Sequence, residues 1–193
     1  STAINTAITF AQLGMRTLLI DGDLRRPRCH KMLGINSGVG LTEYLTGKRD
    51  VHQVVKPTMV QGLFFLSSGA RPPNPTELIA SHKMRDTLQM LRQEYDSIII
   101  DSPPVMPVSE PLLLSTIVDG VVLVVNGQKT PRDVVREARS RLSQVRAKIL
   151  GSVLNRVDIQ RKGYEYHYGY HAAPSGPEDT QWQESENEIE IED

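Results

Sequence analysis

Residues 18–27 read LLIDGDLRRP, and this stretch decides the fold. It opens with three large apolar residues that run into Asp21, a pattern typical of a strand buried within a sheet. Asp23 follows two residues later. A second stretch of the same kind, IIIDSPPV at 98–105, ends its apolar run in Asp101. In open α/β sheets, ligands bind beyond the carboxyl ends of the strands, so the two aspartates predict a ligand site there.

The sequence around these strands alternates between apolar runs and helical patterns. Apolar residues recur at helical spacing in three segments, 3–14, 75–95 and 131–145. We expect the segment at 75–95 to be one helix that begins with a Thr76 cap. Further strands are expected at 63–69, 120–125 and 147–155. The alternation predicts an α/β fold over residues 1–159, with a doubly wound, mostly parallel sheet covered on both faces.

After about residue 159 the apolar pattern stops, so we expect residues 160–193 to form a disordered, flexible tail. Four tyrosines stand on every second residue of this segment: Tyr164, Tyr166, Tyr168 and Tyr170. Residues 177–193 hold eight acidic residues and no Lys or Arg. Removing these eight from the chain's 23 acidic residues leaves 15, against 22 Lys and Arg, in residues 1–176.

A basic body of this kind suits nucleic acid, anionic lipid or nucleotide phosphate, but scattered solvated side chains are the better explanation unless a motif chooses among these partners. We expect no nucleic-acid partner. The longest strongly apolar run, VVLVV at 121–125, is much shorter than the ~20 residues of a membrane-spanning helix. Cys29 is the single cysteine, which excludes an internal disulfide and favours a reducing compartment.

The sequence opens with Ser1 and Thr2 and runs at once into a helical pattern. A P-loop reads G-x-x-x-x-G-K-[ST] and leads into a helix, so we expect these residues to be the end of one. Its glycines, its lysine and the strand before them would then precede residue 1. An ordinary Ser/Thr helix cap is the alternative. The strand that ends in Asp101 would be the Walker B strand.

The motifs together resemble the bacterial tyrosine kinases, over roughly residues 1–170. The features that carry the resemblance are DGDLRRP (21–27), which resembles the Walker A′ motif, PPNPTELIAS (72–81) and the tyrosine cluster. Members of this family are cytoplasmic domains of membrane-linked proteins that govern exopolysaccharide and capsule export. The resemblance implies a P-loop NTPase fold of the deviant Walker type, like that of ParA and MinD. It also implies autophosphorylation on tyrosine with ATP and Mg²⁺.

The resemblance also implies roles for individual residues. The Ser1 hydroxyl would bind Mg²⁺, and Thr2 would lie near the phosphates. Asp21 would organise the metal and accept the proton of the substrate tyrosine, Asp23 would support Mg²⁺ through water, and Asp101 would be the Walker B acid. Asn155 would contact adenine. The tyrosines of the tail, Tyr164, Tyr166, Tyr168 and Tyr170, would be the phosphorylated residues.

The implied assembly is a ring-like homo-oligomer in which each tail enters the neighbouring active site. Its partners would be a membrane-embedded activator, or a transmembrane region of its own, and the polysaccharide export machinery. Its place would be the cytoplasmic side of the bacterial inner membrane. Without the P-loop lysine, we expect residues 1–193 alone to have little kinase activity. Two other functions stay open: a MinD- or ParA-like positioning ATPase, and a non-catalytic regulatory module of an export complex.

Overall fold

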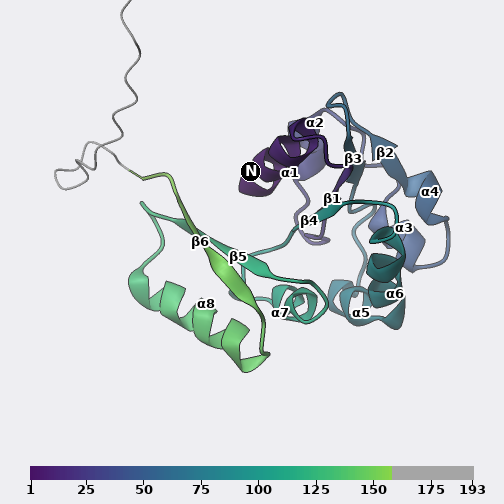
Figure 1. Cartoon of the computed structure of the whole chain (residues 1–193). Helices are drawn as coiled ribbons and strands as arrows, with labels where there is room; N and C mark the ends of the chain where they lie inside the picture. Colours follow the sequence, from purple (N-terminus) through teal and green to yellow (C-terminus); the bar gives the residue numbers. More distant parts are fainter. Residues whose placement is uncertain (158–193) are drawn as a thin grey trace, which may run out of the picture. The chain divides into compact units, whose positions relative to one another are not determined.

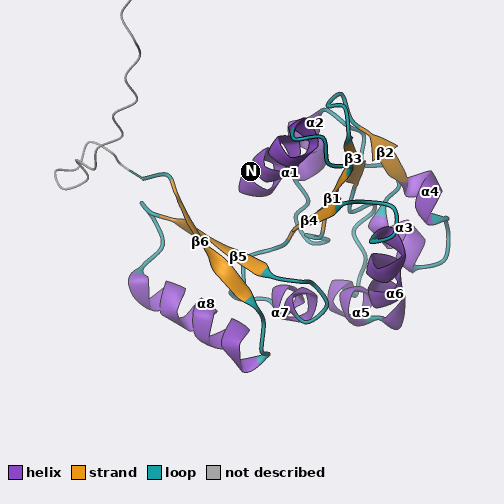
Figure 2. Ribbon diagram, viewed as in Figure 1, coloured by secondary structure: helices purple, strands orange, loops and turns teal. Residues whose placement is uncertain are grey.

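The computed structural model describes residues 1–157, and it confirms the predicted α/β class (Figure 2). A four-stranded sheet has the strand order β2-β3-β1-β4. Its strands are β1 (Thr17–Asp21), β2 (Val55–Pro57), β3 (Leu63–Leu66) and β4 (Ser97–Asp101). β1 is parallel to both β3 and β4, whereas the edge strand β2 is antiparallel to β3. The strand that ends in Asp21 therefore has a paired neighbour on each side.

Helices cover this sheet on both faces (Figure 1). They are α1 (Thr2–Gln12), α2 (Cys29–Leu33), α3 (Leu41–Leu45), α4 (Val51–Val54), α5 (Pro75–Ala80), α6 (His82–Leu91) and α7 (Glu110–Ser115). Leu19 of β1 packs in a cluster with apolar residues of α1 and with Cys29. Leu18 and Ile20 point to the opposite face, where they pack in a second cluster with residues of α3 to α7. A continuous apolar run fits this strand because both of its faces are buried.

A separate two-stranded sheet is formed by β5 (Val121–Asn126) and β6 (Ile149–Asn155), which are parallel and joined by α8 (Arg132–Gln144). The expectation of a sheet covered on both faces is wrong here for residues 1–157, because apolar side chains of both strands are exposed, such as Val122 and Leu150. Among the described residues, β4 pairs only with β1 and β5 only with β6, so each keeps one open edge.

The expectation of one helix over 75–95 is also wrong. The segment forms two helices, α5 and α6, that meet at Ser81, whose backbone is extended (φ −64°, ψ 150°). The Ser81 side chain accepts a hydrogen bond from Met84 N and so caps α6, and Asn74 rather than Thr76 stands at the start of α5. Serine offers the backbone a capping bond that competes with a continuous helix, which explains the break.

Within residues 1–157, no helix is both long enough and apolar enough to cross a membrane. The predicted tail at 160–193, with its four tyrosines and its acidic end, lies outside the described residues.

Candidate active site

The parallel register of β1 and β4 places Asp21 directly opposite Asp101. The next residue, Gly22, donates its backbone N–H to the Asp101 carbonyl at 2.7 Å. A side chain on Gly22 would meet Ile100 Cγ2 at 2.9 Å and the Asp101 carbonyl oxygen at 3.0 Å. Glycine is therefore required between the two acids of DGD, because the backbones approach too closely for a Cβ atom. The two strand ends that looked alike in sequence are neighbours in space.

Asp21 is fully buried, and two backbone N–H groups donate to its carboxylate. The Cys29 N–H lies 3.1 Å from Oδ2, and the Asp23 N–H lies 3.3 Å from Oδ1. Burial raises the pKa of Asp21 to about 6, because the charged form is poorly solvated and Asp101 and Asp23 repel it; the two N–H groups oppose this rise. A carboxyl with a pKa near neutrality is suited to accepting and releasing a proton.

Cys29 is part of this cluster, although sequence reasoning assigned it no place there. It is fully buried, and its Sγ donates to Asp101 Oδ2 at 3.1 Å. The ligand atoms of Asp21, Cys29 and Asp101 all lie within 4.8 Å of one another. Burial and the two neighbouring carboxylates raise the thiol's pKa, so Cys29 stays protonated and acts as a donor, not as a nucleophile. No local sequence motif marks Cys29 as part of the site. The turn that follows DLRRP places it beside the two carboxylates.

Ser1 also reaches the cluster, because its Oγ lies 3.5 Å from Asp101 Oδ1. The Ser1 side chain makes no capping hydrogen bond to α1, so the helix-cap alternative does not describe this hydroxyl. Thr2 is the first residue of α1 and is half-buried. The structure thus brings Ser1, Asp21 and Asp101 together at one edge of the sheet.

Two other predicted residues make different contacts. The Asp23 carboxylate accepts the backbone N–H groups of Arg25 and Arg26, at 3.1 Å and 2.9 Å, so it shapes the loop that follows β1. Asn155 ends β6, where it lies opposite Asn126. Its Oδ1 accepts from Arg156 N at 2.8 Å, and its carbonyl accepts from Gly127 N. The hydrogen bonds of Asn155 therefore stay in the β5–β6 sheet and its flanks.

An ion pair between the exposed Arg25 and the buried Glu110 links the two stretches that carry the family resemblance. Arg25 of DGDLRRP lies 2.7 Å from the carboxylate of Glu110, whose side chain is only 2% exposed. Thr76 of PPNPTELIAS donates to the same Glu110 oxygen at 3.0 Å. Burial alone would raise the pKa of Glu110, but backbone, Arg25 and Thr76 hydrogen bonds outweigh it and lower that pKa. This three-way contact was not predicted, since its members are far apart in the sequence.

The cluster fits a hard divalent cation only in part. Carboxylate and hydroxyl oxygens, which Asp21, Asp101 and Ser1 offer, are the ligands that Mg²⁺ prefers. The protonated thiol of Cys29 is soft and does not suit that ion. Residues 1–157 therefore supply a partial set of oxygen ligands for a magnesium ion, with the thiol as a neighbour that holds Asp101.

Comparisons with known proteins identify the family of the chain. A ParA family model, described as "NUBPL iron-transfer P-loop NTPase", matches residues 1–169. The putative tyrosine-protein kinase CapB of Staphylococcus aureus is 38% identical over 166 residues, which are 86% of this chain and 73% of CapB. The tyrosine-protein kinase YwqD of Bacillus subtilis is 36% identical, over 88% of this chain and 71% of YwqD. The chain belongs to the bacterial tyrosine kinases.

Solved structures support the same family. The kinase domain of the Escherichia coli tyrosine kinase ETK is 33% identical with a TM-score of 0.79, covering 87% of this chain and 66% of that one. MinD from Pyrococcus horikoshii, solved with Mg-ADP, has a TM-score of 0.69 at 21% identity, over 82% of this chain and 65% of MinD. That likeness shows the fold alone. The predicted family and the ParA- and MinD-like fold are confirmed, and the P-loop NTPase fold implies a nucleotide and a divalent metal.

Relatives in this kinase family differ in length. The chain spans 73% of CapB but only 22% of the tyrosine-protein kinase ptk of Acinetobacter johnsonii. The roles of the individual site residues remain predictions from the family resemblance. The same holds for phosphorylation of the four tyrosines.

Proposed function

We propose that this chain is the catalytic portion of an ATP-dependent, autophosphorylating protein-tyrosine kinase that regulates capsule or exopolysaccharide polymerisation and export. The observation that carries the proposal is the pairing of buried Asp21 with half-buried Asp101, which β1 and β4 hold in register. The kinase relatives named above support tyrosine as the acceptor, and names such as CapB support a role in capsule formation.

The reaction transfers the γ-phosphoryl group of ATP to a tyrosine hydroxyl. The bond between the γ-phosphorus and the bridging oxygen breaks and leaves ADP, and a bond forms between that phosphorus and the tyrosine Oη. Asp21 orients the hydroxyl and takes its proton, since its pKa of about 6 leaves it mostly ionised at neutral pH. Phosphoryl transfer depends on positioning and charge stabilisation more than on strong base chemistry, and a buried carboxylate with two N–H donors is well positioned.

Other residues of the chain hold this carboxylate in place. The Cys29 and Asp23 N–H groups fix the Asp21 carboxylate, and the Cys29 thiol fixes that of Asp101. Ser1, Asp21 and Asp101 would hold Mg²⁺, with Asp23 acting through water. When bound, the ion neutralises phosphate charge. Thr2 would lie beside the phosphates and Asn155 would contact adenine.

We also propose that a lysine-bearing phosphate loop outside these 193 residues completes the nucleotide site. A strand that leads into this loop would pair with the open edge of β4 on one side and with that of β5 on the other. Residues 1–193 alone would then have little activity. Placing a phosphate loop with its glycines and lysine before Ser1 should restore phosphorylation; a normal rate from residues 1–193 alone would contradict the proposal.

The acceptors would be Tyr164, Tyr166, Tyr168 and Tyr170, presented to the active site of a neighbouring copy in a ring. Each phosphate adds about −1.5 to −2 charge, so several would repel neighbouring tails and loosen the ring. A membrane component would activate the kinase at the cytoplasmic side of the inner membrane, next to the export machinery.

The first test is mass spectrometry of phosphotyrosine on residues 164–170 after the complete protein is incubated with Mg²⁺ and ATP. Asp21→Asn should reduce phosphorylation by at least about 100-fold, because the general base and a metal ligand are both lost. Asp86→Asn makes the same charge change at an exposed position on α6 and should leave the rate unchanged. If the complete wild-type protein carries no phosphate there, the kinase proposal fails.

A further inference from the structure

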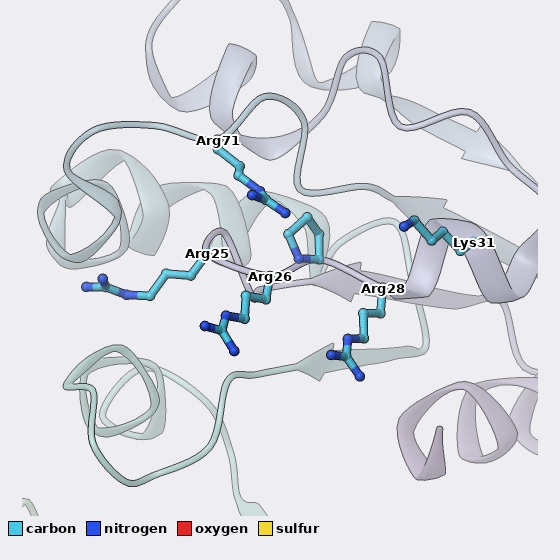
Figure 3. Close-up of a pocket in the computed structure, with 6 residues that line it drawn as sticks. Arg25, Arg26, Arg28, Lys31 and Arg71 are labelled. Atoms are coloured by element: carbon cyan, nitrogen blue, oxygen red, sulfur yellow. The ribbon is translucent and has the colours of Figure 1, made fainter.

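A basic hollow of about 390 Å³ lies beside the loop that follows β1. Its lining consists of Pro27 and five cationic side chains: Arg25, Arg26, Arg28, Lys31 and Arg71. We call this set the cationic pocket. Figure 3 shows Arg71 extending from a separate segment toward the strip of chain at 25–28, which runs directly into the helix that carries Lys31. The side chains of Arg25, Arg26 and Arg28 extend to the other side of this strip. All five cationic residues are exposed, so their charges face solvent together.

Most of this positive charge has no counter-charge among residues 1–157. Arg25 is paired with Glu110. Arg26, Arg28, Lys31 and Arg71 have no described carboxylate within 4.0 Å. Like charges gathered on one surface repel each other and attract an anionic partner.

Two of the backbone N–H groups in the pocket lining already have acceptors. Phosphate-binding loops present free backbone N–H groups to the ligand. Here the N–H groups of Arg25 and Arg26 donate to Asp23, and that of Cys29 donates to Asp21. Those N–H groups are therefore not available to a ligand, and the five cationic side chains of the lining offer several positive charges to an extended peptide with several carboxylates.

The chain itself carries such a peptide. Residues 178–193 contain all eight acidic residues of the end segment and no basic residue, while residues 1–176 have seven more basic than acidic side chains (22 against 15). We propose that the cationic pocket binds this acidic end, residues 178–193, of the same chain or of a second copy. Residue 178 is twenty positions after residue 158, and this length of chain reaches at most about 70 Å when extended. That reach exceeds the radius of about 15 Å expected for a domain of this size.

Docking at this pocket has a consequence that rests on the proposed kinase function. Tyr170 is eight positions before Glu178, so a bound acidic end keeps this tyrosine within about 28 Å of the pocket. The pocket loop also supplies the N–H groups that hold Asp21 and Asp23. The acidic end thereby anchors the segment that carries the acceptor tyrosines near the carboxylates.

Binding of a fluorescent peptide of residues 177–193 tests the docking without any phosphoryl transfer. The receptor is the 193-residue chain with its own eight end carboxylates changed to amides (Asp→Asn, Glu→Gln), so that the pocket is not occupied by its own tail. We expect saturable binding that weakens at least about tenfold between low and high salt, because exposed charges are screened. The wild-type chain should bind the peptide more weakly, since its own end competes.

The deciding variants reverse charge inside and outside the pocket. Arg28→Glu, Lys31→Glu and Arg71→Glu together should lower the peptide affinity by at least about tenfold. The matched control is Arg132→Glu, Arg136→Glu and Arg139→Glu, the same charge change at exposed positions on α8, which should leave affinity within about twofold. Circular dichroism of both triple variants checks that they fold.

Three results would overturn the proposal. One is an equal loss of peptide affinity in the α8 control variant, which would mean that the peptide responds only to the net charge of the chain. Another is equal binding by a peptide whose carboxylates are changed to amides. The third is pocket binding by a tyrosine-phosphorylated peptide of residues 161–171 in the absence of binding by the acidic peptide. Loss of kinase activity would not produce any of these results, so failure of the two proposals can be told apart.

Discussion

The four-stranded sheet and the β5–β6 sheet are built from strands of similar composition, yet they differ strongly in burial. Leu18, Leu19 and Ile20 of β1 are 0% exposed, whereas Val122 and Val124 of β5 are 50% and 47% exposed. β1 has a paired strand on each side and helices on both faces, but among residues 1–157 β5 pairs only with β6. Burial of an apolar strand therefore depends on its neighbours, and the aspartate pair lies in the part where those neighbours are present.

Matched truncations should expose this difference most strongly. Leu19→Ala should lower the free energy of unfolding by about 2–5 kcal/mol, because it opens a cavity in a fully buried site. Val124→Ala removes a half-exposed side chain and should cost less than about 1 kcal/mol. Urea denaturation followed by circular dichroism measures both. Equal costs would mean that β5 is covered by a segment outside the described residues.

The buried carboxylate of Asp21 in the four-stranded sheet should make the free energy of unfolding depend on pH. The pKa of Asp21 rises from 3.8 to about 6 on folding, so between these pH values the folded chain keeps a proton that the unfolded chain releases. This group therefore favours folding at low pH, and that contribution is lost as pH rises from about 4 to 6. The loss amounts to about 3 kcal/mol for a shift of this size.

Unfolding of wild type and Asp21→Asn in EDTA at pH 4, 5, 6 and 7 measures this effect. The stability of wild type relative to the variant should fall across that range, because asparagine does not titrate. Asp86→Asn serves as a control for the change in net charge. A difference between wild type and Asp21→Asn that does not vary with pH would contradict the burial of a titrating Asp21.

The smallest of these effects concerns two neighbouring arginines at the edge of the same region. Arg25→Ala leaves the Glu110 carboxylate buried without its cation and should cost about 2 kcal/mol. Arg26→Ala removes an exposed side chain with no described ion pair, and should change stability by less than about 0.5 kcal/mol. Thermal and urea denaturation compare the two; equal losses would show that the Glu110 pair does not stabilise the fold.

Much of the site could be predicted because it depends on local patterns. An apolar run that ends in aspartate identifies a strand end, and parallel pairing then brings two such ends together, as happens with Asp21 and Asp101. Other features could not be predicted. Cys29 reaches the carboxylates only through the path of the loop after β1, and the contact of Arg25, Thr76 and Glu110 joins residues up to 85 positions apart. The helix break at Ser81 was missed because apolar spacing continues across it.

The sequence by itself determined the α/β class, the family and the aspartates at the strand ends, because hydrophobic period and short motifs are local properties. Only the tertiary structure decided what surrounds those aspartates. Burial raised the pKa of Asp21, strand register placed Asp101 opposite it, and the loop after β1 brought in the Cys29 thiol. The same packing gathered Arg71 and the DLRRP arginines around one hollow. Desolvation and proximity between distant residues are properties of the folded chain, so no local pattern could carry them.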